Sequence, residues 1–193
     1  EPQRQQREDK LYQVLRDWLA SRKYQAKVTA TSRKGKTWGN PDITGIRIEE
    51  LPGQVTFEVA TIEAKIGSDD WAYWLFEAVS HKRFAHRAYF AFAVGTDSPS
   101  VANIKDIDRL CEYAEKYRIG ILAVFISSAD YQTLRSGDVT NLVLSGDNTR
   151  IEVVWPAFHE NVQPAALNEF VRSVLGLKSI QDLCNFANDA EVS

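Results

Sequence analysis

Three residues of the 193-residue chain have the types and spacing that metal-assisted hydrolysis requires. Asp42 follows Pro41, and Glu63 and Lys65 stand two positions apart in Ile62-Glu63-Ala64-Lys65. Two carboxylates can hold a Mg2+ ion, and an amine beside them can orient an attacking water or offset charge on a phosphate. The combination predicts a Mg2+-dependent hydrolase of phosphodiester bonds, that is, a nuclease.

The flanking segments strengthen a signal that is weak by spacing alone. Average amino-acid usage produces Pro-Asp followed by acid-x-Lys in roughly one chain in ten of this length. Here, however, residues 43–48 and 55–66 are strand-like and rich in β-branched side chains, and residues 49–54, with Pro52 and Gly53, predict a turn. We expect a hairpin that carries both halves of the motif.

Strand alternation determines which side chains of this hairpin meet, because successive residues point to opposite faces. One face of the second strand carries Ala60, Ile62, Ala64 and Ile66, and the other carries Thr61, Glu63 and Lys65. Asp42 then approaches Glu63 if the turn places it opposite or diagonal. Two like charges about 4 Å apart repel by roughly 4 kcal/mol at an effective dielectric near 20, so the pair needs a metal ion or a raised pKa. The alternative is a surface hairpin in which Lys65 only pairs with Glu63 or Asp42.

These residues resemble the PD-(D/E)XK superfamily, the restriction-endonuclease-like fold, and most of all its uncharacterised bacterial members. The resemblance covers Pro41-Asp42-Ile43 with Gly45, the strand 57–66, the stretch Glu77-Ala78-Val79-Ser80-His81, and the strand with Tyr89-Phe90-Ala91-Phe92. It weakens after about Phe125. It implies a restriction-endonuclease-like α/β fold in which a mixed sheet is flanked by helices.

The resemblance also implies roles for individual residues. Asp42 and Glu63 would bind Mg2+ (or Mn2+) with help from the backbone carbonyl of Ala64, and Lys65 would be the catalytic lysine. An acidic residue from the first helix often joins them, and Glu8 is the candidate. DNA is the substrate that the resemblance implies, without strandedness or sequence preference.

The order of elements suits this fold. The pattern predicts helices over 5–22, 69–86 and 103–117, and strands over 24–31, 87–94 and 119–126. Strand, helix, strand, helix, strand makes a parallel half of a mixed sheet, attached to the antiparallel hairpin. Residues 128–193 predict short strands over 138–145 and 150–155 and helices over 164–175 and 179–188. We expect a nuclease-like core over 1–127 and a small α+β extension over 128–193 packed on the same domain.

The charge distribution bears on a nucleic-acid partner. The net charge is −3, but residues 128–193 hold four Lys and Arg against nine Asp and Glu, so this segment supplies the acidity. A basic loop over 32–40 leads into the Pro-Asp motif. Its cations and a helix lysine are the candidate nucleic-acid contacts: Arg33, Lys34, Lys36 and Lys82. A solvated, solubilising loop is the alternative.

The predicted helix over 69–86 supplies further candidates. Glu77, Ser80 and His81 share one polar stripe, so Glu77 or His81 could join the metal site or contact substrate, although a role facing water is the blander interpretation. The aromatic cluster of residues 71–76 predicts packing of the helix rather than a binding role. The two cysteines and three histidines lack zinc-ligand spacing, which favours Mg2+ or Mn2+ over zinc.

The composition bears on where in the cell the protein is expected. No apolar run reaches the ~20 residues of a membrane span, and the far-apart Cys111 and Cys184 predict reduced thiols in a cytoplasmic protein. A homodimer and an upstream domain stay open. Two alternatives to a nuclease also stay open: a non-catalytic module that binds nucleic acid or protein, and a small-molecule-binding α/β domain, although the chain lacks a glycine-rich phosphate loop.

Overall fold

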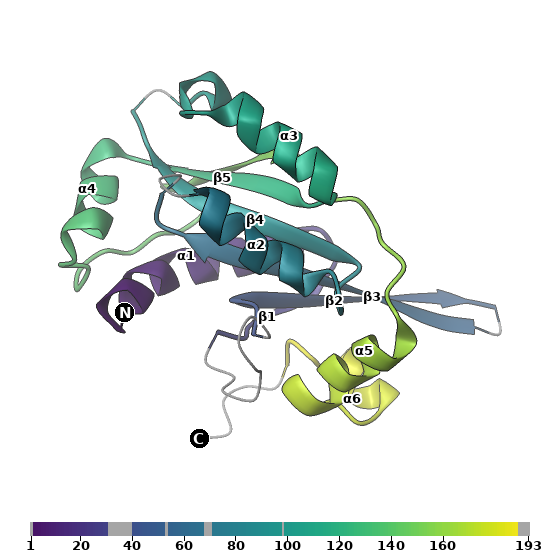
Figure 1. Ribbon diagram of the computed structural model, residues 1–193. Coiled ribbons are helices and arrows are strands. Elements are labelled where there is room, and N and C mark those ends of the chain that lie inside the picture. The colour runs from purple at the N-terminus through teal and green to yellow at the C-terminus, as the bar shows by residue number, and fades with distance from the viewer. Residues whose placement is uncertain (1, 31–39, 53, 68–70, 98, 189–193) are drawn as a thin grey trace.

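A six-stranded mixed sheet with helices on both faces forms the centre of the protein (Figure 1), as expected from the sequence. The computed structural model describes residues 2–30, 40–52, 54–67, 71–97 and 99–188. The strands lie side by side in chain order: β1 (Gln25–Val28), β2 (Ile43–Leu51), β3 (Gln54–Lys65), β4 (Arg87–Gly95), β5 (Gly120–Ile126) and β6 (Arg150–Trp155). β3, β4 and β5 run parallel, whereas the pairs β1–β2, β2–β3 and β5–β6 are antiparallel.

The helices form one layer on each side of the sheet. They are α1 (Pro2–Ser21), α2 (Trp71–His81), α3 (Ile107–Tyr117), α4 (Ser128–Ser136), α5 (Pro164–Glu169) and α6 (Ile180–Cys184), with the short helices η1 (Val101–Asn103) and η2 (Phe170–Val174). Figure 1 shows α2 and α3 in front of the sheet and α1 behind it. One apolar core joins α1 and α4 to the sheet, and another joins α2 and α3 to the opposite face.

Helices cover both faces of the parallel strands, and the apolar sequence of β5 reflects this burial. Every residue of β5 is buried, and its side chains alternate between the two cores: Leu122 and Val124 pack toward α1, and Ile121 and Ala123 toward α2 and α3. A continuous apolar run is what such a strand requires. β3 lies beside β4, and its polar residues Glu58, Glu63 and Lys65 are buried as well.

The segment after residue 127 packs against the same sheet. β6 pairs with β5, and a third apolar core joins Phe170 and Val171 to Ile46 of β2 and Val59 of β3. The strand predicted over 138–145 is wrong. Leu142 and Leu144 are buried and Val143 is exposed, but β6 already occupies the neighbouring edge of the sheet, and residues 138–145 join no strand. The helix α4, which the sequence analysis missed, precedes this segment.

Among the described residues, no helix combines the length and apolar character needed to cross a lipid bilayer. Cys111 and Cys184 form no disulfide, and both are partly exposed.

Candidate active site

The hairpin register brings Asp42 and Glu63 together. Ile43 pairs with Ile62 in the antiparallel β2–β3 ladder, so the next pair outward consists of Asp42 and Glu63. Asp42 lies just before β2, and its backbone carbonyl accepts hydrogen bonds from the Thr29 and Ala30 amides at 2.8 and 3.1 Å. The end of β1 therefore fixes the backbone that carries the first carboxylate.

Both oxygens of Asp42 are held by hydrogen bonds. Oδ1 accepts the Tyr12 hydroxyl at 2.8 Å, and Oδ2 accepts the amide of Ala64, the residue after Glu63, also at 2.8 Å. The amide and the carbonyl of one strand residue point to the same side. The carbonyl of Ala64 is therefore directed toward the Asp42 side of β3. This is the direction that a carbonyl ligand beside the two carboxylates needs.

Lys65 lies among carboxylates from three elements. Its Nζ forms an ion pair with Glu63 of the same strand, another with Glu77 of α2 at 3.0 Å, and a longer one with Glu8 of α1 at 3.9 Å. Glu8, Glu63 and Lys65 are each only 5–6% exposed. The two helices that cover opposite faces of the sheet thus both reach this end of β3.

The electrostatics show too many negative charges for one ammonium. Burial, followed by the charge of Asp42, raises the pKa of Glu63 well above its usual range. Burial also raises the pKa of Asp42, despite Lys65 and the hydrogen bonds from Ala64 and Tyr12. Burial alone would lower the pKa of Lys65, but the surrounding carboxylates outweigh burial and raise it. Lys65 is therefore a firmly charged ammonium, and the acids around it lack sufficient countercharge.

His81 is buried rather than exposed to water, which corrects the blander expectation for it. Only 1% of the residue is exposed, and its Nε2 lies 3.9 Å from Glu63 Oε2, beyond hydrogen-bonding distance. Burial, then the charges of Arg83 and Lys65, lower the pKa of His81 to about 3, so its imidazole is neutral. Its Nδ1 is buried without a hydrogen-bond partner among the described residues.

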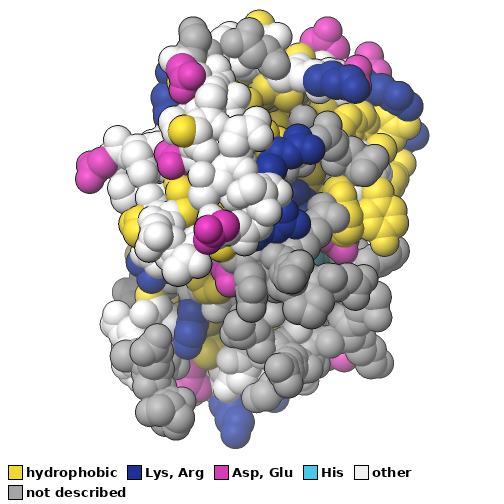
Figure 2. Space-filling view, turned by 90° about the vertical axis from the view of Figure 1, so that its left-hand side faces the viewer, with side chains coloured by type: hydrophobic (Ala, Val, Ile, Leu, Met, Phe, Trp, Pro, Cys, Tyr) yellow, Lys and Arg dark blue, Asp and Glu magenta, His cyan; other side chains and the backbone are white. Residues whose placement is uncertain are grey.

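Two side chains that the sequence analysis did not assign to the site contact it. Tyr12 lies one turn after Glu8 on α1, a spacing that puts both on one helix face. The ring centroid of Trp74 in α2 lies 4.9 Å from Lys65 Nζ. Beyond it, Tyr73 is 60% exposed. Figure 2 shows hydrophobic side chains gathered at the upper right, the side on which α2 and α3 lie.

A glycine in β2 lets α1 come this close. A Cβ on Gly45 would lie 3.0 Å from Tyr24 Cβ and 3.2 Å from a methyl carbon of Leu19. Both contacts are tighter than ordinary van der Waals packing, so a larger residue would displace the end of α1. Glu8 and Tyr12 belong to that helix, and their reach toward Asp42 and Lys65 depends on its position.

Of the four residues expected to contact nucleic acid, the structure describes only Lys82. Arg33, Lys34 and Lys36, with the loop they share, lie outside the described residues. Lys82 donates to the Tyr117 carbonyl at 2.6 Å and lies 3.5 Å from Glu160. It is therefore already engaged within the protein.

The donor atoms suit a hard divalent cation, although the described part of the chain contains no ready-made site. Carboxylate and carbonyl oxygens are the ligands that Mg2+ prefers. Among the described residues, however, no three His, Cys, Asp or Glu side chains form a group positioned to hold a metal ion. The oxygens of Glu63 and Glu77 converge on the Lys65 ammonium instead.

Comparison with protein-family models, with curated proteins and with solved structures finds no significant match to this chain.

Proposed function

We propose that this protein is a metal-dependent endonuclease that hydrolyses phosphodiester bonds of DNA, and that it belongs to the PD-(D/E)XK superfamily. The observation that carries the proposal is the buried cluster in which four carboxylates, those of Asp42, Glu63, Glu8 and Glu77, act on the single ammonium of Lys65. A divalent ion would supply the missing countercharge. Asp42, Glu63 and the Ala64 carbonyl would hold it, with Glu8 as a further acid.

The contacts of Asp42 and Lys65 are consistent with the roles proposed for them, metal binding for Asp42 and alignment of a water for Lys65. The Tyr12 hydroxyl and the Ala64 amide fix the orientation of Asp42, and Lys65 presents a permanent positive charge beside it. Bound Mg2+ supplies Lewis-acid polarisation of the phosphate and lowers the pKa of a coordinated water. Lys65 can donate a hydrogen bond that aligns a water for attack, because an ammonium has three donors and no acceptor. Neutral His81 adds no competing positive charge beside Glu63.

One observation favours a second candidate function. The Lys65 ammonium occupies the centre of the carboxylate group, and the described residues contain no preassembled metal site. A non-catalytic module that retains this architecture and binds nucleic acid or protein could have the same arrangement. The two candidates differ in whether divalent metal and DNA together produce cleavage.

The test is incubation of the purified protein with DNA and Mg2+ or Mn2+. We expect cleavage by the wild type and at least a ~100-fold loss in Asp42→Asn and Lys65→Ala, the usual scale for removing one group that stabilises a transition state. Asp138→Asn and Lys105→Ala alter exposed residues and serve as matched controls that keep full activity. Circular dichroism verifies the fold of each variant. Equal cleavage by all five proteins would trace the activity to a contaminant, and no cleavage by the wild type would favour the non-catalytic module.

A further inference from the structure

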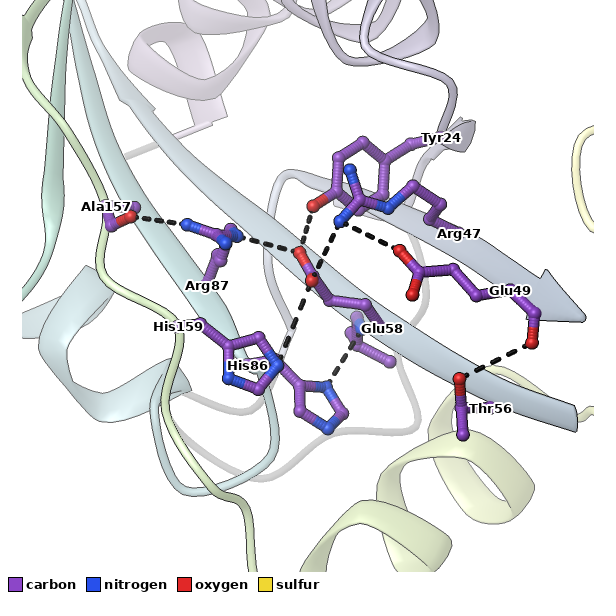
Figure 3. Close-up of polar contacts among 10 residues, drawn as sticks. Tyr24, Arg47, Glu49, Thr56, Glu58, His86, Arg87, Ala157 and His159 are labelled. Atoms are coloured by element: carbon purple, nitrogen blue, oxygen red, sulfur yellow. Dashed lines mark hydrogen bonds and ion pairs between the residues drawn. The ribbon is translucent and has the colours of Figure 1, made fainter. Parts of the chain in front are cut away.

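A second cluster of charged residues surrounds Glu58, five residues before Glu63 on β3. An odd separation puts the two glutamates on opposite faces of the strand, and five residues span about 16 Å. Figure 3 shows Tyr24, Arg47, Arg87 and His159 directed toward the Glu58 carboxylate. The cluster is therefore separate from the carboxylates around Lys65.

The Glu58 carboxylate accepts hydrogen bonds from two arginines and a tyrosine. Arg87 Nε donates to its Oε1 at 2.8 Å, Arg47 Nη2 donates to its Oε2 at 3.1 Å, and the Tyr24 hydroxyl also donates to Oε1. Burial would raise the pKa of Glu58, but the Tyr24 hydrogen bond and the two arginines outweigh burial and lower it. One ionised carboxylate thus positions two guanidinium groups from β2 and β4.

These guanidinium groups belong to the wall of a surface hollow of about 420 Å³. Four cations line it, Arg22, Lys23, Arg47 and Arg87, together with Ser21, Tyr24 and Tyr89. No carboxylate is part of the lining within the described residues. Because the volume lies within the range of small-molecule sites, roughly 300–1,000 Å³, the hollow has room for a phosphorylated ligand.

Internal contacts neutralise this positive charge only in part. Arg47 and Arg87 share Glu58, and Arg47 Nη2 also lies 3.4 Å from Glu49. The Arg22 guanidinium stacks 3.8 Å from the Trp18 ring centroid and forms no ion pair with a described carboxylate, and neither does Lys23. Two of the four cations that line the hollow therefore have no ion-pair partner among the described residues.

The end of α1 explains part of this arrangement but not all of it. Cations are favourable at a helix C-terminus, which accounts for Arg22 and Lys23 immediately after Ser21. The same helix dipole acts against a bound anion, but amides of residues 22–24 already donate to the Leu19 and Ala20 carbonyls, which reduces the exposed negative charge. Arg47 and Arg87 come from strands, and the helix dipole does not account for them.

We propose that this hollow binds a phosphomonoester dianion. Arginine forks match phosphate oxygens geometrically, and Lys23 adds a point charge. The net positive charge of the lining favours a dianion over the single charge of a phosphodiester. The ligand is a small phosphorylated metabolite or the phosphorylated end of a nucleic acid, since both present the same group. This inference does not depend on the proposed nuclease activity.

The test uses inorganic phosphate as the probe, with chloride at matched ionic strength as the reference. We expect wild-type protein to bind phosphate with a Kd in roughly the millimolar range, and a tenfold excess over Kd to raise Tm by about 3–6 °C. The double variant R22Q/K23Q should bind at least tenfold more weakly. Gln at position 23 keeps a Cβ in the same left-handed backbone conformation, φ 67°, so the substitution leaves that strain unchanged.

Arg16→Gln is the matched control, because Arg16 is another arginine of the last turns of α1 but lies outside the hollow and pairs with Asp17. It should keep the full phosphate response. An equal response in wild type and R22Q/K23Q, or none in the wild type at tens of millimolar phosphate, would overturn the proposal.

A second set of probes distinguishes the source of the phosphate. A sugar phosphate, a 5′-phosphorylated oligonucleotide and its unphosphorylated twin are titrated against the same proteins. Preferred binding of the sugar phosphate supports a metabolite ligand, and preferred binding of the phosphorylated oligonucleotide supports a nucleic-acid end. Equal binding of both oligonucleotides would contradict the monoester assignment.

Discussion

Two positions along β3 carry charge clusters of opposite design. At the end near residue 63, several carboxylates surround one ammonium, and the pKa values of Asp42 and Glu63 are raised. Near residue 58, several cations surround one carboxylate, and the pKa of Glu58 is lowered. Each cluster contains more charged groups of one sign than a neutral ion pair needs. Excess charge of one sign, rather than the presence of an ion pair, therefore indicates what kind of ligand a site can accept.

The largest effect should come from removing the central cation of the first cluster. Lys65→Ala leaves the buried carboxylates of Glu8 and Glu63 without their ammonium, and we expect the free energy of unfolding to fall by about 3–5 kcal/mol at pH 7 without metal. Urea denaturation measures it. A loss below about 1 kcal/mol would mean that these acids are already protonated, and it would weaken the contrast between the clusters around Lys65 and Glu58.

Replacing each of the two glutamates by glutamine should change the free energy of unfolding in different directions. Glu58→Gln removes the countercharge of Arg47 and Arg87 and should cost about 2 kcal/mol. Glu63→Gln removes one of several crowded carboxylates and should be neutral or stabilise by about 1 kcal/mol in metal-free buffer. The two variants share one strand and one chemical change, so each is the other's control. Destabilisation of similar size in both would remove the distinction.

The pH dependence of stability should differ between the same two residues. A carboxyl whose folded pKa is raised binds more protons in the folded state, so stability falls as pH rises from the ordinary value of 4.5 toward the folded pKa of Glu63. The lowered pKa of Glu58 gives the reverse: its contribution is present above pH 4.5 and is lost as pH falls through its folded pKa.

Buried His81 also favours stability at higher pH, since its folded pKa of about 3 lies below the ordinary 6.5. Comparing wild type with Glu63→Gln cancels this contribution, because both contain His81. In EDTA, stability measured from pH 5 to 8 should decline more steeply in the wild type, with an upper limit of about 1.4 kcal/mol per pH unit for one proton. Parallel curves would contradict the raised pKa of Glu63.

Strand periodicity was enough to predict which residues meet at the centre of the candidate site. A period of two puts Glu63 and Lys65 on one face, and a short turn fixes the register that sets Asp42 beside Glu63. The contributions of α1 and α2 required tertiary information. The helical stripe identified Glu77 and His81, but helix spacing alone does not tell which way a stripe faces, and His81 is buried. Tyr12 reaches Asp42 from α1, whose Leu19 packs closely over Gly45.

The segment after residue 127 shows how a correct pattern can give a wrong element. Burial does alternate at Leu142, Val143 and Leu144, but β6 takes the place beside β5 and residues 138–145 pair with no strand. The missed helix α4 had a signal in the sequence. Ser127 caps its start by accepting the Asp130 amide at 3.0 Å, and Gly137, at φ 95°, ends it. Ser-x-x-Asp followed by a glycine is a recognisable pair of helix boundaries.

Calorimetric titration of Mg2+ and Mn2+ tests the central claim most directly, because it asks whether the carboxylate-rich end of β3 takes up a divalent cation. With a short DNA duplex present or absent, we predict binding to the wild type that is lost in Asp42→Asn and Glu63→Gln and retained in Asp138→Asn. Absence of binding by the wild type under both conditions, or equal binding by all four proteins, would contradict the account.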